Sequence, residues 1–166
     1  MKNFYLILFF ILIAGNIFIY KTISEPHILI VNVLEVGEKG DAILIRTPSG
    51  KTLLVDVGPD ASILRALGAA LPMWQRRIDV IALTSEKTAQ TGGLQDVKNR
   101  YHIPTPIHFG TAGMPYGAHL TLDGVSVAVF YTGLLNISYG SISLSISSST
   151  PKGVYTSDGK VITKTK

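Results

Sequence analysis

Hydrophobic residues occur in short runs along most of the chain, and the spacing within each run predicts its secondary structure. Continuous apolar stretches bounded by Gly, Pro or polar residues are typical of buried strands. Such stretches occupy residues 27–36, 42–47, 52–56 and 78–83. The segment Pro48-Ser49-Gly50-Lys51 separates the second stretch from the third, and its composition predicts a hairpin turn.

Two segments have helical spacing instead. The apolar residues Ile63, Leu64, Leu67 and Leu71 recur at intervals of three and four, and Pro72 ends the run. Asp60 precedes them and can cap the free amide groups of the first turn. A second helix is expected from about residue 94 to 101, after a polar loop at 84–91 and the pair Gly92-Gly93.

The rest of the chain returns to strand patterns. Residues 119–131 predict a hairpin with Asp123-Gly124 at its turn, and residues 141–147 alternate strictly between polar and apolar side chains. Residues 154–163 predict a last hairpin around Asp158-Gly159. The order of strands, helix, strand, helix and strands predicts an α/β domain of the α+β sandwich type, with helices on one face of a mixed sheet.

The most hydrophobic segment is residues 4–20, which contain no charged side chain. A helix of this length spans roughly 26 Å, slightly less than the roughly 30 Å hydrocarbon core of a bilayer. The pattern favours a single-pass transmembrane anchor at residues 1–24, followed by a Glu25-Pro26 linker, and hence a membrane protein with an extracytoplasmic domain. A cleaved signal peptide is the alternative, although no Ala-x-Ala site follows the segment.

The charge distribution argues against a basic binding groove on the folded domain. The net charge is +4 and the pI is near 9.3, but residues 27–151 contain nine basic and nine acidic side chains. The excess lies in residues 152–166, a predicted C-terminal hairpin or tail with four Lys and one Asp. This segment permits weak contact with nucleic acid or anionic lipid, and a solvated end is the alternative. The absence of cysteine excludes disulfides.

A family resemblance is carried by residues 36–60, which read VGEKGDAILIRTPSGKTLLVDVGPD. This run resembles the metallo-β-lactamase-like domain of the ComEC DNA-uptake (competence) family. The resemblance covers about residues 28–94 and continues more faintly over 120–147. It implies a partial αββα metallo-β-lactamase-like fold at residues 27–151. The chain departs from the family by an apparent extra residue at Glu38-Lys39 and by Val57, where the family usually has Gly.

The metal-binding loop of that family is altered in this chain. In the family, an H-x-H-x-D-H loop between a Leu-Thr pair and two glycines binds one or two zinc ions, which activate water for hydrolysis. Here Leu83-Thr84 and Gly92-Gly93 are present, but the four ligand positions hold Ser85, Lys87, Ala89 and Gln90. Alanine has no donor atom, a protonated lysine repels cations, and neutral oxygens are weak ligands for zinc. No zinc or other cofactor is therefore expected.

Two aspartates are assigned by the same resemblance. Asp56 matches a structural aspartate that helps to hold the ligand loop, and a plain turn aspartate is the alternative. Asp158 aligns with a later metal-bridging Asp, although Asp158-Gly159 also reads as an ordinary turn. The chain ends before the family's later histidine motif, which implies a truncated domain. The implied vestigial active-site loop comprises Asp56, Thr84, Ser85, Glu86, Lys87, Ala89, Gln90 and Asp158.

The histidines and the tryptophan add little to this site. The histidines lack the spacing of a ligand pair on one element, so loop and strand-end positions are expected for His27, His102, His108 and His119. Trp74, beside Arg76-Arg77, could stack on a base, but a packing role is favoured.

Three hypotheses follow for function. The favoured one is a non-catalytic pseudo-enzyme that binds or scaffolds an unknown protein partner, in the DNA-uptake context that the resemblance implies. The alternative is a metal-dependent hydrolase of phosphodiesterase or nuclease type, with atypical ligands such as Glu86, Asp56, Asp158 and a displaced histidine. The third is a defective or incomplete gene product.

Overall fold

The computed structural model describes residues 2–23, 28–37, 40–110, 113–131, 134–147 and 149–165, and within the first helix it describes the side chains of residues 5–16. The predicted linker Glu25-Pro26, the histidine His27 and the inserted Glu38-Lys39 lie outside the described residues.

The larger of two sheets is mixed, as the sequence predicts. Its strand order is β11-β10-β1-β2-β3-β4-β5. Neighbours are antiparallel from β11 to β3, whereas β3, β4 and β5 are parallel. The strands are β1 (Leu29–Glu35), β2 (Asp41–Arg46), β3 (Thr52–Val55), β4 (Val80–Leu83), β5 (Ile107–His108), β10 (Gly153–Ser157) and β11 (Ile162–Lys164). The C-terminal hairpin is present, and β10 pairs directly with β1.

The smaller sheet contains four antiparallel strands in the order β6-β7-β8-β9. They are β6 (His119–Leu122), β7 (Val125–Tyr131), β8 (Leu134–Tyr139) and β9 (Ile142–Ile146). The predicted hairpin turn at Asp123-Gly124 is confirmed, and both residues have the positive φ that such two-residue turns require (50° and 77°). Strand β8 was not predicted, because Asn136 and the flanking glycines interrupt its apolar pattern.

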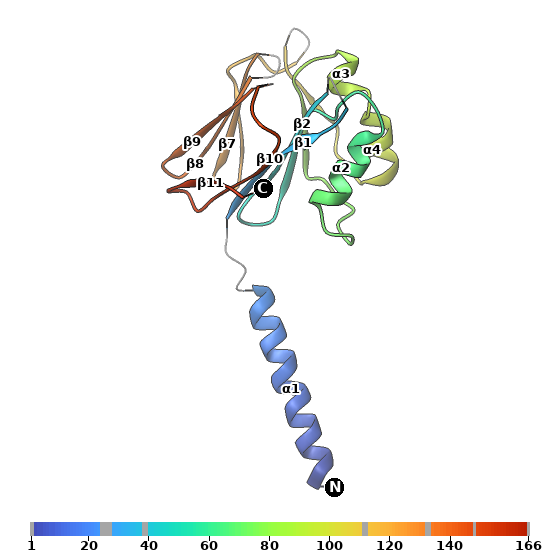
Figure 1. Cartoon of the computed structure of the whole chain (residues 1–166), viewed down its shortest axis with the longest axis vertical. Helices are drawn as coiled ribbons and strands as arrows, with labels where there is room; N and C mark the ends of the chain where they lie inside the picture. Colours follow the sequence, from blue (N-terminus) through green and yellow to red (C-terminus); the bar gives the residue numbers. More distant parts are fainter. Residues whose placement is uncertain are drawn as a thin grey trace.

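Three short helices cover one face of the larger sheet (Figure 1). They are α2 (Ser62–Ala70), α3 (Thr88–Thr91) and α4 (Leu94–Arg100). The residue that caps α2 is Ala61, without a side-chain cap hydrogen bond, and not Asp60 as predicted; Asp60 Oδ1 accepts the Ser62 N–H at 2.8 Å, just before the helix. The prediction of a loop throughout residues 84–91 is wrong in its second half, where α3 forms a single turn that leads into Gly92-Gly93.

The core is divided between the two faces of the larger sheet. Val31, Ile45 and Val127 belong to an apolar cluster between the sheets, whereas Leu44 and Leu67 belong to a second cluster beneath the helices. Successive residues of β2 therefore face opposite layers, and both layers are apolar. This is why the strands read as continuous hydrophobic runs. The result is a mixed α/β fold of three layers: helices, larger sheet, smaller sheet.

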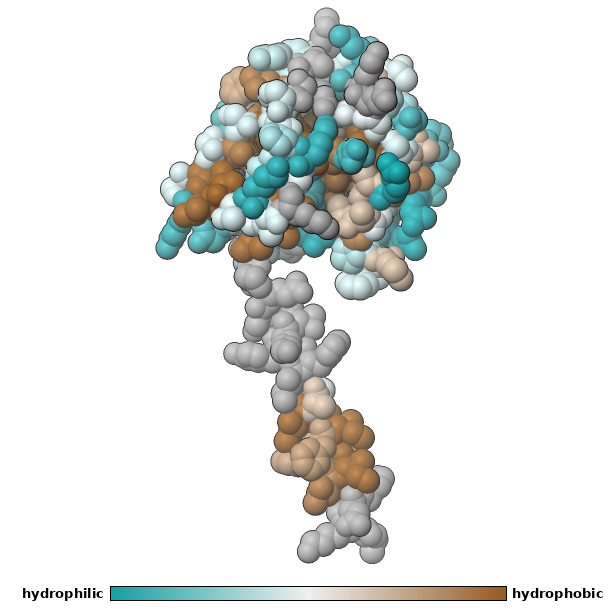
Figure 2. Space-filling model, in the orientation of Figure 1, coloured by the Kyte–Doolittle hydropathy of each residue, from teal (hydrophilic) through white to brown (hydrophobic). Residues whose placement is uncertain are grey.

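The N-terminal helix α1 (Lys2–Ile23) lies apart from these layers (Figure 1). Its described side chains are mainly hydrophobic and exposed, as Figure 2 shows. Among the described residues, however, no helix has both the length and the hydropathy needed to cross a membrane. The predicted membrane span at residues 4–20, and with it the predicted single-pass membrane localisation, is thereby corrected.

Candidate functional site

The candidate site lies where three parallel strands of the larger sheet end. Because β3, β4 and β5 run in the same direction, their carboxyl ends meet at one edge of the sheet. Asp56 directly follows β3, Thr84 directly follows β4, and His108 is the last residue of β5. Ligand sites of open α/β sheets form outside such carboxyl ends.

Asp56 fixes the start of the loop that follows β4. It is only 4% exposed, and its carboxylate accepts hydrogen bonds from the Thr84 amide at 2.8 Å and from the Thr84 hydroxyl at 2.6 Å. Its backbone has a φ of +56°, a conformation that Asp and Asn adopt more readily than most residues. Asp56 thus orders the loop, as the resemblance implies, and the contact that does so is with Thr84.

Backbone contacts hold the far end of the same loop. The Val57 amide donates to the Gln90 carbonyl at 2.8 Å, and the Gly93 amide donates to the Gly58 carbonyl at 3.1 Å. A β-carbon on Gly92 would lie 2.0 Å from the Pro59 carbonyl oxygen. A side chain is therefore excluded at Gly92, because the two backbone segments approach too closely to admit one.

A cavity of about 440 Å³ opens beside this loop. Tyr116 lies beside it, and its hydroxyl donates a hydrogen bond to the Thr84 carbonyl at 3.0 Å. The cavity is lined by Ser85, Glu86, Lys87, His108, Phe109, Gly110 and Tyr116. The sequence did not predict the last three for this site, since β5 contains only two residues and leaves no periodic signal.

The remaining loop residues do not line this cavity. Ala89 is half-buried, and Gln90 is only 8% exposed. The Gln90 side-chain carbonyl Oε1 has no hydrogen-bond partner among the described residues. The predicted vestigial loop is therefore divided: Ser85, Glu86 and Lys87 line the cavity, whereas Gln90 is buried and Asp56 and Thr84 support the loop from within.

The side chains of the loop do not suit a zinc or manganese ion. Of the residues that line the cavity, only Glu86 and His108 are of the types that such metals prefer. Lys87 adds a positive charge beside them. Within the described ranges, no group of three or more His, Asp or Glu side chains could hold a metal.

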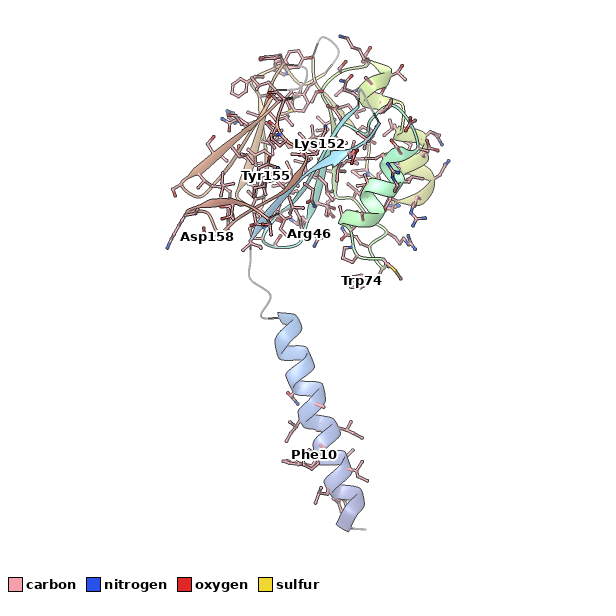
Figure 3. The ribbon with its side chains drawn as sticks, in the orientation of Figure 1. Phe10, Arg46, Trp74, Lys152, Tyr155 and Asp158 are labelled. Atoms are coloured by element: carbon pink, nitrogen blue, oxygen red, sulfur yellow. The ribbon has the colours of Figure 1, made fainter. Side chains whose placement is uncertain are left out.

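Asp158 is not part of this site, and its assignment to the vestigial loop is corrected. The register pairs Ser157 with Leu29, at the start of β1, whereas β3 and Asp56 end beside the other end of β1. Figure 3 shows Asp158 at the end of the domain nearest α1. Its carboxylate accepts the Lys160 and Val161 amides, and these hydrogen bonds lower the pKa of Asp158 below its ordinary value. It is a hairpin-turn residue.

The other residues considered from the sequence are dispersed. His102 is exposed beside the segment that leads into β4, where its amide donates to the Arg76 carbonyl at 2.7 Å, and His119 lies on β6. Of the histidines that the structure describes, only His108 lines the cavity. The predicted packing role of Trp74 is wrong, because that side chain is 84% exposed.

No family model and no curated protein matches the chain. Solved structures do. One is a metallo-β-lactamase from Cronobacter sakazakii (Enterobacter sakazakii) with a HARLDQ motif, with 19% identity and a TM-score of 0.48, covering 63% of this chain and 54% of that one. A motif mutant of a metallo-β-lactamase from the same organism has 18% identity and a TM-score of 0.47, covering 70% and 58%.

A third similar structure is a diphosphatase from the PhnP family, with 13% identity and a TM-score of 0.49, covering 70% of this chain and 63% of that chain. The chain thus spans less than two thirds of the length of each of these structures.

Proposed function

We propose that this chain is a non-catalytic binding domain with a metallo-β-lactamase-like frame, and that the cavity beside residues 85–87 is its recognition site. One observation carries the proposal. The buried Asp56–Thr84 hydrogen bonds hold the loop in place, while the loop presents Ser85, Glu86 and Lys87 to the cavity instead of a set of metal ligands.

The side chains of the cavity indicate what kind of group binds there. Within the described residues, no carboxylate lies within 4.0 Å of the Lys87 ammonium group. The Ser85 hydroxyl oxygen accepts the Lys87 amide at 3.0 Å, which leaves the hydroxyl hydrogen free to donate. A cation and a hydroxyl donor on one wall suit an anionic group, such as an acidic side chain of a partner protein.

The wider context of the proposal comes from the resemblance to the ComEC family in residues 36–60. It supports a role as a pseudo-enzyme that binds or scaffolds in a DNA-uptake setting, without a bound cofactor. Weak contact with nucleic acid through the C-terminal hairpin is part of the same proposal. Lys160 is exposed at the turn of that hairpin, and Lys164 is exposed on β11, with its ammonium group 5.8 Å from the centre of the Tyr155 ring.

The alternative, a metal-dependent hydrolase with atypical ligands, is favoured by a single observation. Glu86 and His108 line the same cavity, and they provide a carboxylate from the loop after β4 and an imidazole from the end of β5. A hydrolase of this kind would need further ligands from the substrate or from water.

The test combines binding with turnover in the full chain. Inorganic phosphate, used as a simple anionic probe, should bind about tenfold or more weakly to Lys87→Gln than to the unchanged chain. Lys98→Gln, which removes an exposed lysine outside the cavity, should bind it normally. With zinc or manganese, bis(p-nitrophenyl) phosphate should be hydrolysed no faster than in buffer. Metal-dependent hydrolysis that Glu86→Gln and His108→Ala both abolish would overturn the proposal in favour of the hydrolase.

A further inference from the structure

The loop between α2 and β4 presents two large apolar side chains to solvent. Met73 and Trp74 are each 84% exposed, more than any other large hydrophobic side chain described. Figure 3 shows Trp74 at the tip of the domain on the side of the helices. Exposed apolar side chains that adjoin one another commonly mark an interaction surface.

The surrounding structure holds these two side chains outward. Leu71 and Ile78 are buried at the two ends of the loop, with 6% and 0% exposure. Between them the Gln75 amide donates to the Pro72 carbonyl at 3.0 Å, which closes a turn with Met73 and Trp74 at its apex. The pair is therefore a structured tip rather than a loose segment of chain.

Basic side chains flank this tip. Arg76 and Arg77 follow it and are exposed. Arg46 lies at the same end of the sheet, because it pairs with Thr52, whose amide donates to Asp79 at 2.9 Å. Its guanidinium contacts the carbonyl of Ala70, the last residue of α2.

Of the acidic side chains described at this end, two form ion pairs, and Asp158 accepts backbone amides instead. Asp79 pairs with Arg77 at 3.1 Å, and Asp123 pairs with Lys51 at 2.9 Å. Among the described residues, no carboxylate lies within 4.0 Å of Arg76. The end that carries the tip is thus positively charged around an apolar centre.

The shape and composition of the tip indicate which kind of polyanion, nucleic acid or an anionic lipid surface, it would bind. A single-stranded nucleic acid is usually bound in a basic groove by several aromatic side chains that stack on successive bases. Here Trp74 forms a convex apex, and the exposed aromatic pair Phe130-Tyr131 lies at the far end of β7. Tryptophan and methionine at an apex, ringed by arginines, instead fit the interface of an anionic bilayer, where indole rings lie at headgroup level and guanidinium groups contact phosphates.

We propose that this end of the domain docks on an anionic lipid surface, with Met73 and Trp74 inserted among the headgroups and Arg76 and Arg77 on the lipid phosphates. No segment crosses the bilayer in this arrangement. The start of β1 lies at the same end, because Ile30 pairs with Arg46. The docked domain would therefore face the lipid with the end that lies nearest α1 in Figure 1.

The chain contains a single tryptophan, so its fluorescence reports on this tip directly. Vesicles of phosphatidylcholine with phosphatidylglycerol should shift the emission of the full chain to shorter wavelength, and lipids with brominated acyl chains should quench it. Pure phosphatidylcholine vesicles should bind more weakly. Arg76→Gln should lower the affinity about fivefold, whereas the matched control Arg65→Gln, on the outer face of α2, should leave it unchanged.

Three outcomes would overturn the proposal. The first is a chain that sediments with the vesicles while Trp74 emission stays unshifted and unquenched, because another segment would then make the contact. The second is stronger quenching by a single-stranded oligonucleotide than by lipid, which would assign the tip to nucleic acid. The third is a shift to shorter wavelength that grows with protein concentration without lipid, which would assign the tip to a second copy of the chain. Met73→Ser, a variant of an exposed residue, keeps the fluorophore and should weaken insertion without unfolding the domain.

Discussion

Two pairs of residues in the candidate site differ in their burial and in their hydrogen bonds. Asp56 and Thr84 are buried and bonded to each other, whereas Glu86 and Lys87, two and three residues further along the chain, are exposed beside the cavity. The first pair contributes to folding, so its loss would cost stability whatever the protein does. The second pair contributes little to folding. Separate residues of this loop therefore carry its shape and its chemistry.

The largest effect is expected at Asp56. Asp56→Ala should lower the free energy of unfolding by about 3–5 kcal/mol, because two buried donors of Thr84 lose a charged acceptor. Asp56→Asn should cost about half as much, since the amide keeps one acceptor and tolerates the positive φ. Urea denaturation of the full chain measures both values. A loss below about 1 kcal/mol for the alanine variant would remove the distinction between the two pairs.

Gly92→Ala should have the next largest effect. The added β-carbon would meet the Pro59 carbonyl, and separating the two backbone segments should cost about 2–3 kcal/mol. Gly68→Ala is the matched control, because its β-carbon would meet no atom within 4 Å and it lies inside α2. That change should stabilise the domain by about 0.5–1 kcal/mol. Equal effects of the two variants would show that the approach at Gly92 is not close in solution.

Thr84→Val should cost less than either change, about 1–2 kcal/mol, because it removes the hydroxyl donor and keeps the amide bond to Asp56. Thr84→Ser keeps the hydroxyl and loses only a methyl group, which should lower the free energy of unfolding by about 1 kcal/mol. The two variants separate the hydrogen bond from packing. Thermal or urea unfolding in which valine proves more stable than serine would show that packing dominates at this position.

The smallest effect is expected on the cavity side. Glu86→Ala and His108→Ala should each change stability by no more than about 0.5 kcal/mol, because both side chains are exposed. The same urea titrations test this. A loss comparable to that of Thr84→Val would mean that the cavity residues also support the fold.

The sequence predicted the buried residues that hold the loop of the site better than the residues that line its cavity. The hydrophobic runs predicted the central strands, whose two faces are both buried, and the helical spacing of apolar residues predicted α2 and α4, which bury one face. The resemblance led to Asp56 as a strand-end aspartate, and to Thr84 through the Leu83-Thr84 pair. The role of Asp56 in holding the loop is visible only in the hydrogen bonds.

The errors share a physical cause, which is that pairing between distant segments leaves no local signal. Tyr116 donates a hydrogen bond to Thr84 from more than thirty positions away in the sequence. Strand β5 is too short to show a periodic pattern of apolar residues. Asp158 was assigned from a motif, but the antiparallel pairing of β10 with β1 carries it to the opposite end of the sheet. Trp74 was expected to pack because hydrophobicity alone does not say which side of a turn a residue occupies.

The most direct test of the account is the zinc content of the purified full chain, measured beside a variant into which the four ligands of the resembled family are introduced: Ser85→His, Lys87→His, Ala89→Asp and Gln90→His. The unchanged chain, offered zinc during purification, should retain less than about 0.1 ion per chain, whereas the variant should retain about one or more, because the Asp56–Thr84 support is already in place. Stoichiometric, tightly held zinc in the unchanged chain would contradict the account.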